Sequence, residues 1–104
     1  MSEFPIRMRA TLTGETLVVK VLIAHPMHNG LAKNDKGELI AAHFITRIVL
    51  RLNGELVAEV LTGSGIARDP LFGWRLRGAK SGDRVAVAWT DNRGFEGGKE
   101  VTVA

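Results

Sequence analysis

The sequence of 104 residues contains no cysteine. It therefore offers no disulfide bond, no thiolate metal ligand and no cysteine nucleophile. Tyrosine is absent as well, and the large aromatic residues are four phenylalanines and two tryptophans. The tryptophans, Trp74 and Trp89, occur in alternating, strand-like segments. In such a segment a tryptophan more often packs in the core than forms a ligand platform.

Charge of one sign is not concentrated along the chain. The sequence has 14 lysines and arginines against 11 acidic residues, for a net charge of +3, and the basic residues are scattered from Arg7 to Lys99. A nucleic-acid-binding face usually appears as a concentrated basic stripe with interleaved aromatic residues. We therefore predict no nucleic-acid partner.

Long hydrophobic runs are missing too. The longest, LVVKVLIA at 17–24, is interrupted by Lys20 and falls far below the roughly 20 apolar residues of a membrane-spanning helix. The N-terminal stretch MSEFPIRMRATL lacks the apolar centre of a signal peptide. We predict no membrane contact and, from the chain's own sequence, a protein that stays in the cytoplasm.

The features that are present are short strand-like segments separated by turn residues. Apolar residues make up 45% of the chain and charged residues 24%, a balance that suits one globular domain over residues 1–104. Apolar and polar residues alternate in several segments, and glycine, asparagine and proline punctuate the chain between them. The predicted strands cover residues 6–12, 16–24, 41–52, 55–61, 71–77, 83–90 and 100–104. This pattern predicts an all-β fold, an immunoglobulin-like antiparallel β-sandwich of about seven strands.

The Asn-Gly pair at 53–54 predicts a tight hairpin. A two-residue loop would pair Leu52 with Glu55 and turn Glu55 and Glu59 toward the aliphatic face of the preceding strand, where unpaired carboxylates are costly. A three-residue loop that begins at Leu52 shifts the register by one residue and satisfies both faces. The predicted pairs are Arg51 with Glu55, Arg47 with Glu59, Leu50 with Leu56, and Ile48 with Ala58.

This register predicts an apolar stripe on the outer face of the hairpin, with Val49 opposite Val57 and Ile45 opposite Leu61. Lys20 marks the outer face of the strand at 16–24. The outward apolar residues are then Val18, Leu22, Ile45, Val49, Val57 and Leu61. A contiguous apolar stripe with a charged rim is typical of a partner interface. The alternative is that another segment of the same chain covers it.

The stretch IAHPMHNG at 23–30 contains His25 and His28, and His43 follows later. Zinc sites use three or four ligands at suitable spacing, and the only nearby acids are Asp35 and Glu38. With no cysteine and no second close histidine pair, we predict no metal. A metal-dependent enzyme that uses the three histidines is kept as an alternative hypothesis.

No catalytic motif is recognisable. TGSG at 62–65 resembles part of a phosphate-binding loop, but the lysine and the helix that such a loop requires do not follow it. Asp35, Asp69 and Asp91 are interpreted as turn residues. We predict no catalytic residue and no cofactor.

Three segments together carry a family resemblance. LIAHPMHNGLAKNDKGELIAAHFI at 22–45 resembles a family segment with His-Pro-Met, a Lys-Asp-x-x-Gly-like stretch and a strand that opens with Phe-Ile. LNGELVAEVLTGSGIARDP at 52–70 and SGDRVAVAWTDNRG at 81–94 follow in the family's order and spacing. The ordered set, over residues 6 to 104, resembles the SoxZ subunit of the bacterial SoxYZ sulfur-carrier complex.

The resemblance implies a non-catalytic role. In that family SoxZ is an immunoglobulin-like sandwich that pairs with SoxY, and SoxY carries the substrate sulfur on a cysteine near the end of a glycine-rich C-terminal arm. Other Sox enzymes then contact the complex transiently. The family is exported in the folded state with a partner that carries a signal. The resemblance therefore implies a periplasmic site of action and replaces the cytoplasmic expectation.

The resemblance also suggests where the partner binds. The loop residues His25, Met27 and His28 become candidates for contact with the partner or its sulfur-bearing arm, beside the apolar stripe. Asp69 and Pro70 are further candidates, although the family usually has Asn-Pro followed by an aromatic residue where this chain has Asp69-Pro70-Leu71. The alternative is a free-standing immunoglobulin-like binding or adhesion module, which an exposed Trp74 or Trp89 would favour.

Overall fold

The structure is a computed structural model that describes residues 4–63 and 65–104. Ser64 of the TGSG stretch therefore lies outside the described residues. Seven strands form: β1 (Ile6–Thr13), β2 (Thr16–Ile23), β3 (Ile45–Leu52), β4 (Glu55–Leu61), β5 (Leu71–Arg77), β6 (Arg84–Asp91) and β7 (Glu96–Thr102). The described part of the chain contains no helix that is long and apolar enough to cross a membrane.

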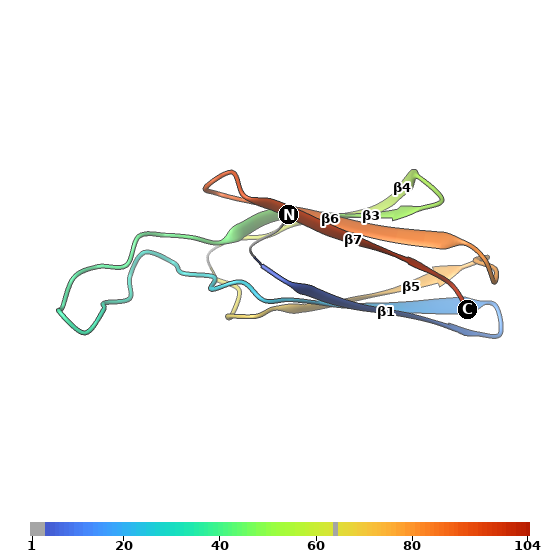
Figure 1. Ribbon diagram of the computed structural model, residues 1–104, viewed down its shortest axis with the longest axis horizontal. Helices are drawn as coiled ribbons and strands as arrows, with labels where there is room; N and C mark the ends of the chain where they lie inside the picture. Colours follow the sequence, from blue (N-terminus) through green and yellow to red (C-terminus); the bar gives the residue numbers. More distant parts are fainter. Residues whose placement is uncertain (1–3, 64) are drawn as a thin grey trace.

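The strands form two antiparallel sheets, seen edge-on as two layers in Figure 1. One has the order β1-β2-β5 and the other the order β4-β3-β6-β7. The chain changes sheet between β2 and β3, between β4 and β5, and again between β5 and β6. Such cross-sheet connections characterise immunoglobulin-like sandwiches. The predicted all-β sandwich of seven strands is therefore confirmed.

The core lies between the two layers. The inward residues of β2, β3 and β6 are almost fully buried because side chains alternate along a strand and the second sheet covers one face. Burying one valine, leucine or isoleucine contributes about 1.5–3 kcal/mol. The central buried residues are Leu17, Val19, Val21, Ile23, Ile48, Leu50, Val85, Val87 and Trp89. Trp89 is thus a core residue as predicted, and Trp74 is half-buried against the same core.

Two predicted strands had boundaries that were wrong by more than one residue. Residues 41–44 lie outside β3, which begins at Ile45. β7 begins at Glu96, four residues before the predicted start at 100, and so includes Gly97 and Gly98. Glycine ordinarily argues against a strand. Here it allows a close approach, because a Cβ atom at Gly98 would lie 2.8 Å from the carbonyl oxygen of Val87.

The predicted register of the β3–β4 hairpin was also wrong. Leu52 pairs with Glu55 across a two-residue turn, and both Asn53 and Gly54 have positive φ, as a type I′ turn requires. A bulge in β4 at Val57 then shifts the register. The pairs beyond it are Leu50 with Ala58, Val49 with Glu59, Ile48 with Val60, and Arg47 with Leu61. The two-residue turn was expected to bury the carboxylate of Glu59 without a partner. The bulge avoids that cost, because it keeps Glu59 out of the core.

The connection between β2 and β3, residues 24–44, extends well beyond the sandwich and is called the projecting loop (Figure 1, cyan to green). It contributes to a long axis of 52 Å in a molecule only 22 and 19 Å across. Its two limbs pair at isolated bridges between His28 and His43 and between Lys33 and Leu39. Near its tip the side-chain oxygen of Asn34 accepts hydrogen bonds from the backbone N–H groups of Lys36 and Glu38.

Candidate functional site

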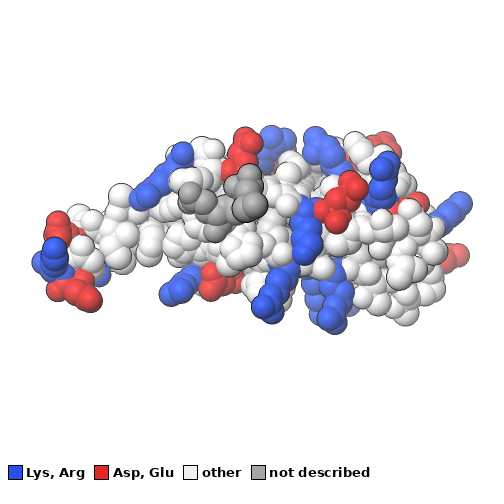
Figure 2. Space-filling model, viewed as in Figure 1, with Lys and Arg blue, Asp and Glu red and all other residues white. Residues whose placement is uncertain are grey.

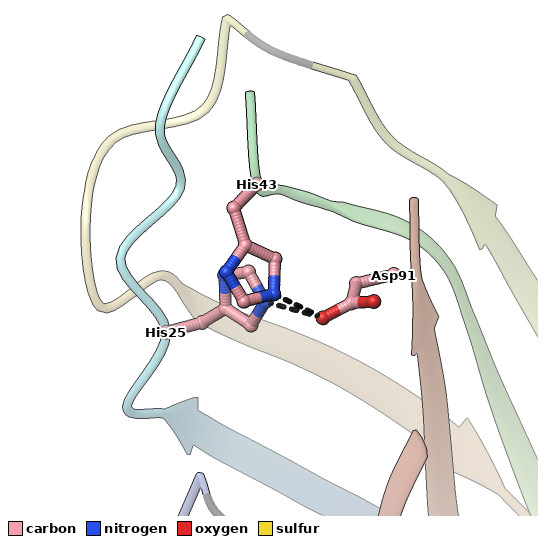
Figure 3. A group of neighbouring side chains, drawn as sticks. All are labelled: His25, His43 and Asp91. Carbon is pink, nitrogen blue, oxygen red and sulfur yellow. Dashed lines mark hydrogen bonds and ion pairs between the residues drawn. The ribbon is translucent and has the colours of Figure 1, made fainter. Parts of the chain in front are cut away.

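Three polar side chains meet in the interior at the base of the projecting loop (Figure 3). His25 follows β2, His43 precedes β3, and Asp91 is the last residue of β6. Both imidazole Nε2 atoms converge on one oxygen, Asp91 Oδ2, at 3.0 Å from His25 and 2.7 Å from His43. The three residues are called the His–Asp–His cluster. Since β2 and β6 belong to different sheets, the cluster joins the two layers of the sandwich.

The hydrogen bonds determine which histidine nitrogen carries the proton. The backbone N–H of Met27 donates to Nδ1 of His25 at 3.1 Å, so Nδ1 presents its lone pair. The proton of the neutral ring is therefore on Nε2, which donates to Asp91. His43 also donates from Nε2, because the Oδ2 atom it faces belongs to an ionised carboxylate that can only accept.

Burial sets the protonation preferences of the cluster. The side chains of His25 and Asp91 are fully buried and that of His43 is 9% exposed. Burial lowers the pKa of His25 below its ordinary 6.5, and the nearby His43 adds to this, although the hydrogen bond to Asp91 acts the other way. Burial alone would raise the pKa of Asp91. The bonds donated by the two histidines and by backbone N–H groups outweigh it and lower that pKa below its ordinary 3.8.

Aromatic rings pack against the cluster. The Phe4 ring lies 4.7 Å from His25 and 5.5 Å from His43, measured between ring centroids. Trp89 meets the His25 ring edge to face at 5.4 Å, and Phe95 lies 5.5 Å from His43. This surrounding excludes water, so the hydrogen bonds to Asp91 form in a medium of low polarity, where each is strengthened.

The turn after Asp91 holds the second limb of the projecting loop. Asp91 Oδ1 accepts from the N–H groups of Arg93 and Phe95, which closes the turn between β6 and β7. Asn92 accepts from the N–H of Phe44 and donates to the carbonyl oxygen of Ala42. The Arg93 guanidinium also donates to the Ala42 carbonyl, at 3.3 Å. One four-residue turn thus fixes the direction in which the loop leaves the sandwich.

The cluster groups three possible metal ligands within 4.8 Å, but its hydrogen bonds do not suit a metal. A metal on His25 Nε2 would need that atom's lone pair, which would move the proton to Nδ1. Nδ1 would then face the Met27 N–H, donor against donor. Of the three histidines considered as metal ligands from the sequence, His25 and His43 belong to the cluster. The His28 ring does not, and Asp91 is the third member instead.

Asp91 is the site residue that the sequence interpretation missed. It was assigned only as a turn residue, and that role is real: one carboxylate oxygen caps the turn. The other oxygen accepts from residues 48 and 66 positions away in the chain. The available signal was its position at the end of a buried strand, which carries its side chain into the sandwich while Asp35 and Asp69 stay exposed.

The predicted interface residues do not share one surface. Val18 and Leu22 lie half-exposed on the outer side of β2, as expected, but β2 and β3 belong to different sheets, so their outer faces point in opposite directions. Val57 and Leu61 are exposed on β4, at 41% and 75%. Val49 also points outward from the sheet, although it is only 8% exposed.

Ile45 contradicts its predicted outward position, being fully buried in the core. A bulge between Ile45 and Arg47 makes Thr46 an extra residue and reverses the alternation before it. The loop candidates are also mostly internal. His25, Met27 and Pro70 are buried, His28 is half-exposed and Asp69 is exposed. Met27 has positive φ, and its sulfur accepts from the N–H of Ile45.

The predicted ion pair between Arg47 and Glu59 is confirmed, at 2.6 Å, although the register behind it was wrong. The two residues are diagonal neighbours, since Glu59 lies opposite Val49. Their side chains reach each other along the outer face because diagonal neighbours are within range of long side chains.

The fold and the cluster define an immunoglobulin-like domain with a hydrogen-bonded polar centre at one end. The particular family follows from sequence comparison. The family described as sulphur oxidation protein SoxZ matches residues 6–102, and the chain belongs to it. Membership connects the chain to the Sox system of sulfur oxidation and confirms the resemblance. The comparison with curated proteins found no match.

Proposed function

We propose that the chain is a non-catalytic subunit of a sulfur-carrier complex. It pairs with a SoxY-like protein whose C-terminal cysteine holds the sulfur intermediates covalently. In this assignment the chain supplies a rigid sandwich beside the carrier arm, and the chemistry takes place on the partner.

One observation carries the proposal. The chain belongs to a sulfur-oxidation family, yet its 104 residues include no cysteine to which sulfur could be attached. A covalent carrier needs a nucleophilic sulfur atom, and a buried His–Asp–His cluster closed off by rings does not supply one. The carrier atom is therefore assigned to another chain.

The outer side of β4 supports a pairing surface. β4 is an edge strand, and it exposes Leu56, Val57 and Leu61 at 48%, 41% and 75%. These three residues are called the β4 apolar surface. An edge strand with exposed aliphatic residues tends to associate with another chain unless it is covered. We assign the SoxY-like partner to this surface, next to the Arg47–Glu59 pair and Val49.

The alternative of a free-standing binding or adhesion module receives less support. That role was expected to use an exposed tryptophan as a platform. Trp89 is 2% exposed, and Trp74 is half-buried against the core.

The proposed place of action is the periplasm, reached by export together with a signal-bearing partner, where other Sox enzymes contact the complex transiently. Cell fractionation with and without the partner tests this. Periplasmic accumulation that does not require the partner would contradict it.

Co-expression with a SoxY-like protein that carries a C-terminal Gly-Gly-Cys arm tests the pairing. We expect a one-to-one complex that survives size-exclusion chromatography at micromolar concentration. A partner variant with serine in place of the arm cysteine should still bind, because the arm is the cargo site and not the pairing site. If both proteins elute as monomers, the proposed function is wrong.

A further inference from the structure

Basic side chains that are far apart in the sequence gather on the outer face of the three-stranded sheet. Alternation along β1, β2 and β5 turns every second residue outward, and all the basic ones among these are exposed. The five are Arg7 and Arg9 from β1, Lys20 from β2, and Arg75 and Arg77 from β5. Together they are called the basic face. These three strands contain no acidic residue.

The view in Figure 2 agrees with this arrangement. Lysine and arginine side chains project along much of the lower rim of the molecule, on the side where β1 and β5 lie, with an acidic patch among them toward the projecting loop, whereas blue and red alternate along the upper rim. The strands of the four-stranded sheet carry four basic and five acidic residues between them. The charge imbalance therefore belongs to one sheet.

Within residues 4–63 and 65–104, none of the five cations takes part in an ion pair. Glu15 stands in the turn between β1 and β2, and Asp69, before β5, pairs with its neighbour Arg68. Moreover, Arg9 and Lys20 stand directly opposite each other in the β1–β2 register. Like charges at directly opposed positions destabilise a sheet, so this fold tolerates a cost that an acidic partner would remove.

Aliphatic side chains share the face with the cations. Arg7, Leu22 and Leu71 form one cross-strand row, in which Leu71 is 67% exposed. A shallow depression lined by Arg7, Arg9, Lys20, Leu22 and Leu71 lies along it. Arginine mixed with aliphatic residues is typical of protein interfaces.

The aromatic rings of β5 do not contribute to the basic face. Phe72 and Trp74 turn inward and stack on each other with ring centroids 6.4 Å apart. The face therefore offers nucleic-acid bases no stacking platform. Cations with aliphatic residues, and without aromatic ones, match an acidic protein surface best.

We propose that the basic face docks an acidic surface of a protein partner. It lies on the opposite side of the sandwich from the β4 apolar surface, so both can be occupied at once. The contact relies on carboxylates of the partner placed opposite Arg9, Lys20 and Arg75.

An oligoglutamate peptide serves as the probe, titrated into the isolated chain and followed by NMR chemical shifts. Shifts should concentrate on β1, β2 and β5, and raising the salt concentration should weaken binding steeply. The double variant K20E/R75E should bind about tenfold more weakly or worse. The matched control R51E/R84E changes the net charge equally but on the four-stranded sheet, and it should bind as the wild type does.

Several outcomes would overturn the proposal: equal weakening in both double variants, shifts spread over both sheets, or stronger binding of duplex DNA or anionic lipid vesicles than of the peptide at equal charge. Circular dichroism checks that each variant is folded. If K20E/R75E does not fold, the single variant R75E replaces it, since Arg75 is exposed and lies opposite Val18. The test uses no SoxY-like protein, so its failure would leave the proposed pairing intact.

Discussion

The two sheets of this sandwich have similar inner faces and different outer faces. Inside, both present buried aliphatic residues such as Val19 and Val21 from β2 and Ile48 and Leu50 from β3. Outside, the four-stranded sheet balances its charges, partly through the Arg47–Glu59 pair, and exposes the β4 apolar surface. The three-stranded sheet exposes the basic face, with no acidic residue in its strands.

This difference distinguishes the positions whose residues folding requires from the positions that can vary with little loss of stability. Packing between the sheets dictates the inward positions, because each buried methylene contributes to stability. Outward positions cost little to change, so a one-sided charge pattern there points to recognition and not to folding. The His–Asp–His cluster is among the features that folding requires, since it is buried and joins the two sheets.

The largest effect on stability is expected from removing the carboxylate that joins the two sheets. Asp91→Ala leaves two buried imidazoles without their acceptor and opens the turn that holds the projecting loop. We expect a loss of about 3 kcal/mol in the free energy of unfolding, measured by urea denaturation.

Asp83→Ala is the matched control for this change. Asp83 also caps a turn, by accepting from the N–H of Lys80, but it holds no histidine. We expect a clearly smaller loss. Equal losses in the two variants would mean that Asp91 acts only as a turn residue, as its sequence position suggested.

Acid should weaken the His–Asp–His cluster that joins the two sheets. The folded-state pKa of His25 is below its ordinary 6.5, so the unfolded chain takes up a proton that the folded chain refuses. Stability is therefore complete above about pH 7 and falls as the pH drops below 6.5, by at most about 1.4 kcal/mol per pH unit for one proton. The lowered pKa of Asp91 adds a further loss below its ordinary 3.8.

Urea midpoints measured at about ten pH values between pH 8 and pH 4 give this profile. The variant His25→Gln should be less stable at neutral pH and should show a flatter profile between about pH 7 and pH 5. A wild-type midpoint that is constant over that range would contradict the assignment of a neutral, buried His25.

The basic face predicts a stabilising substitution. Lys20→Glu replaces the like-charge pair with Arg9 by an attractive pair at the same cross-strand position. We expect a gain of about 0.5 kcal/mol in the free energy of unfolding. Sodium chloride should reduce the gain, because both side chains are exposed. A loss of stability that salt does not change would mean that the cations are not repelling one another.

The smallest effect is expected from metal ions. Because His25 Nδ1 already accepts a backbone N–H, stoichiometric Zn²⁺ should leave the melting temperature unchanged at neutral pH. A metal that bound the folded cluster would raise the melting temperature in proportion to its occupancy. A rise that is lost in His43→Ala would restore the metal interpretation.

The sequence predicted the strands well where alternation was strong. The segments at 6–12, 16–24, 55–61 and 71–77 match observed strands to within one residue at each end. These segments carry their inward and outward positions in the local pattern. Bulges were not visible in that pattern, so the extra residues Val57 and Thr46 shifted the hairpin register and the orientation of Ile45.

The site could not be predicted in the same way, because it is built by tertiary contacts. His25 and Asp91 are far apart in the chain and meet because β2 and β6 end at the same end of the sandwich. The basic residues looked scattered for the same reason. Strand pairing collects Arg9, Lys20 and Arg75 onto one face, although the sequence places acidic residues between them.

A matched pair of substitutions tests most directly the claim that the β4 apolar surface is the pairing surface. Leu61 and Leu71 are both exposed, at 75% and 67%, and lie on the outer sides of opposite sheets. The dissociation constant of the complex with a SoxY-like partner is measured for Leu61→Asp and Leu71→Asp by calorimetry. We predict that Leu61→Asp weakens the complex by about 100-fold, as expected for a charge placed in an apolar contact, while Leu71→Asp leaves the affinity unchanged. Equal affinities for both variants, or the reverse order, would contradict that claim.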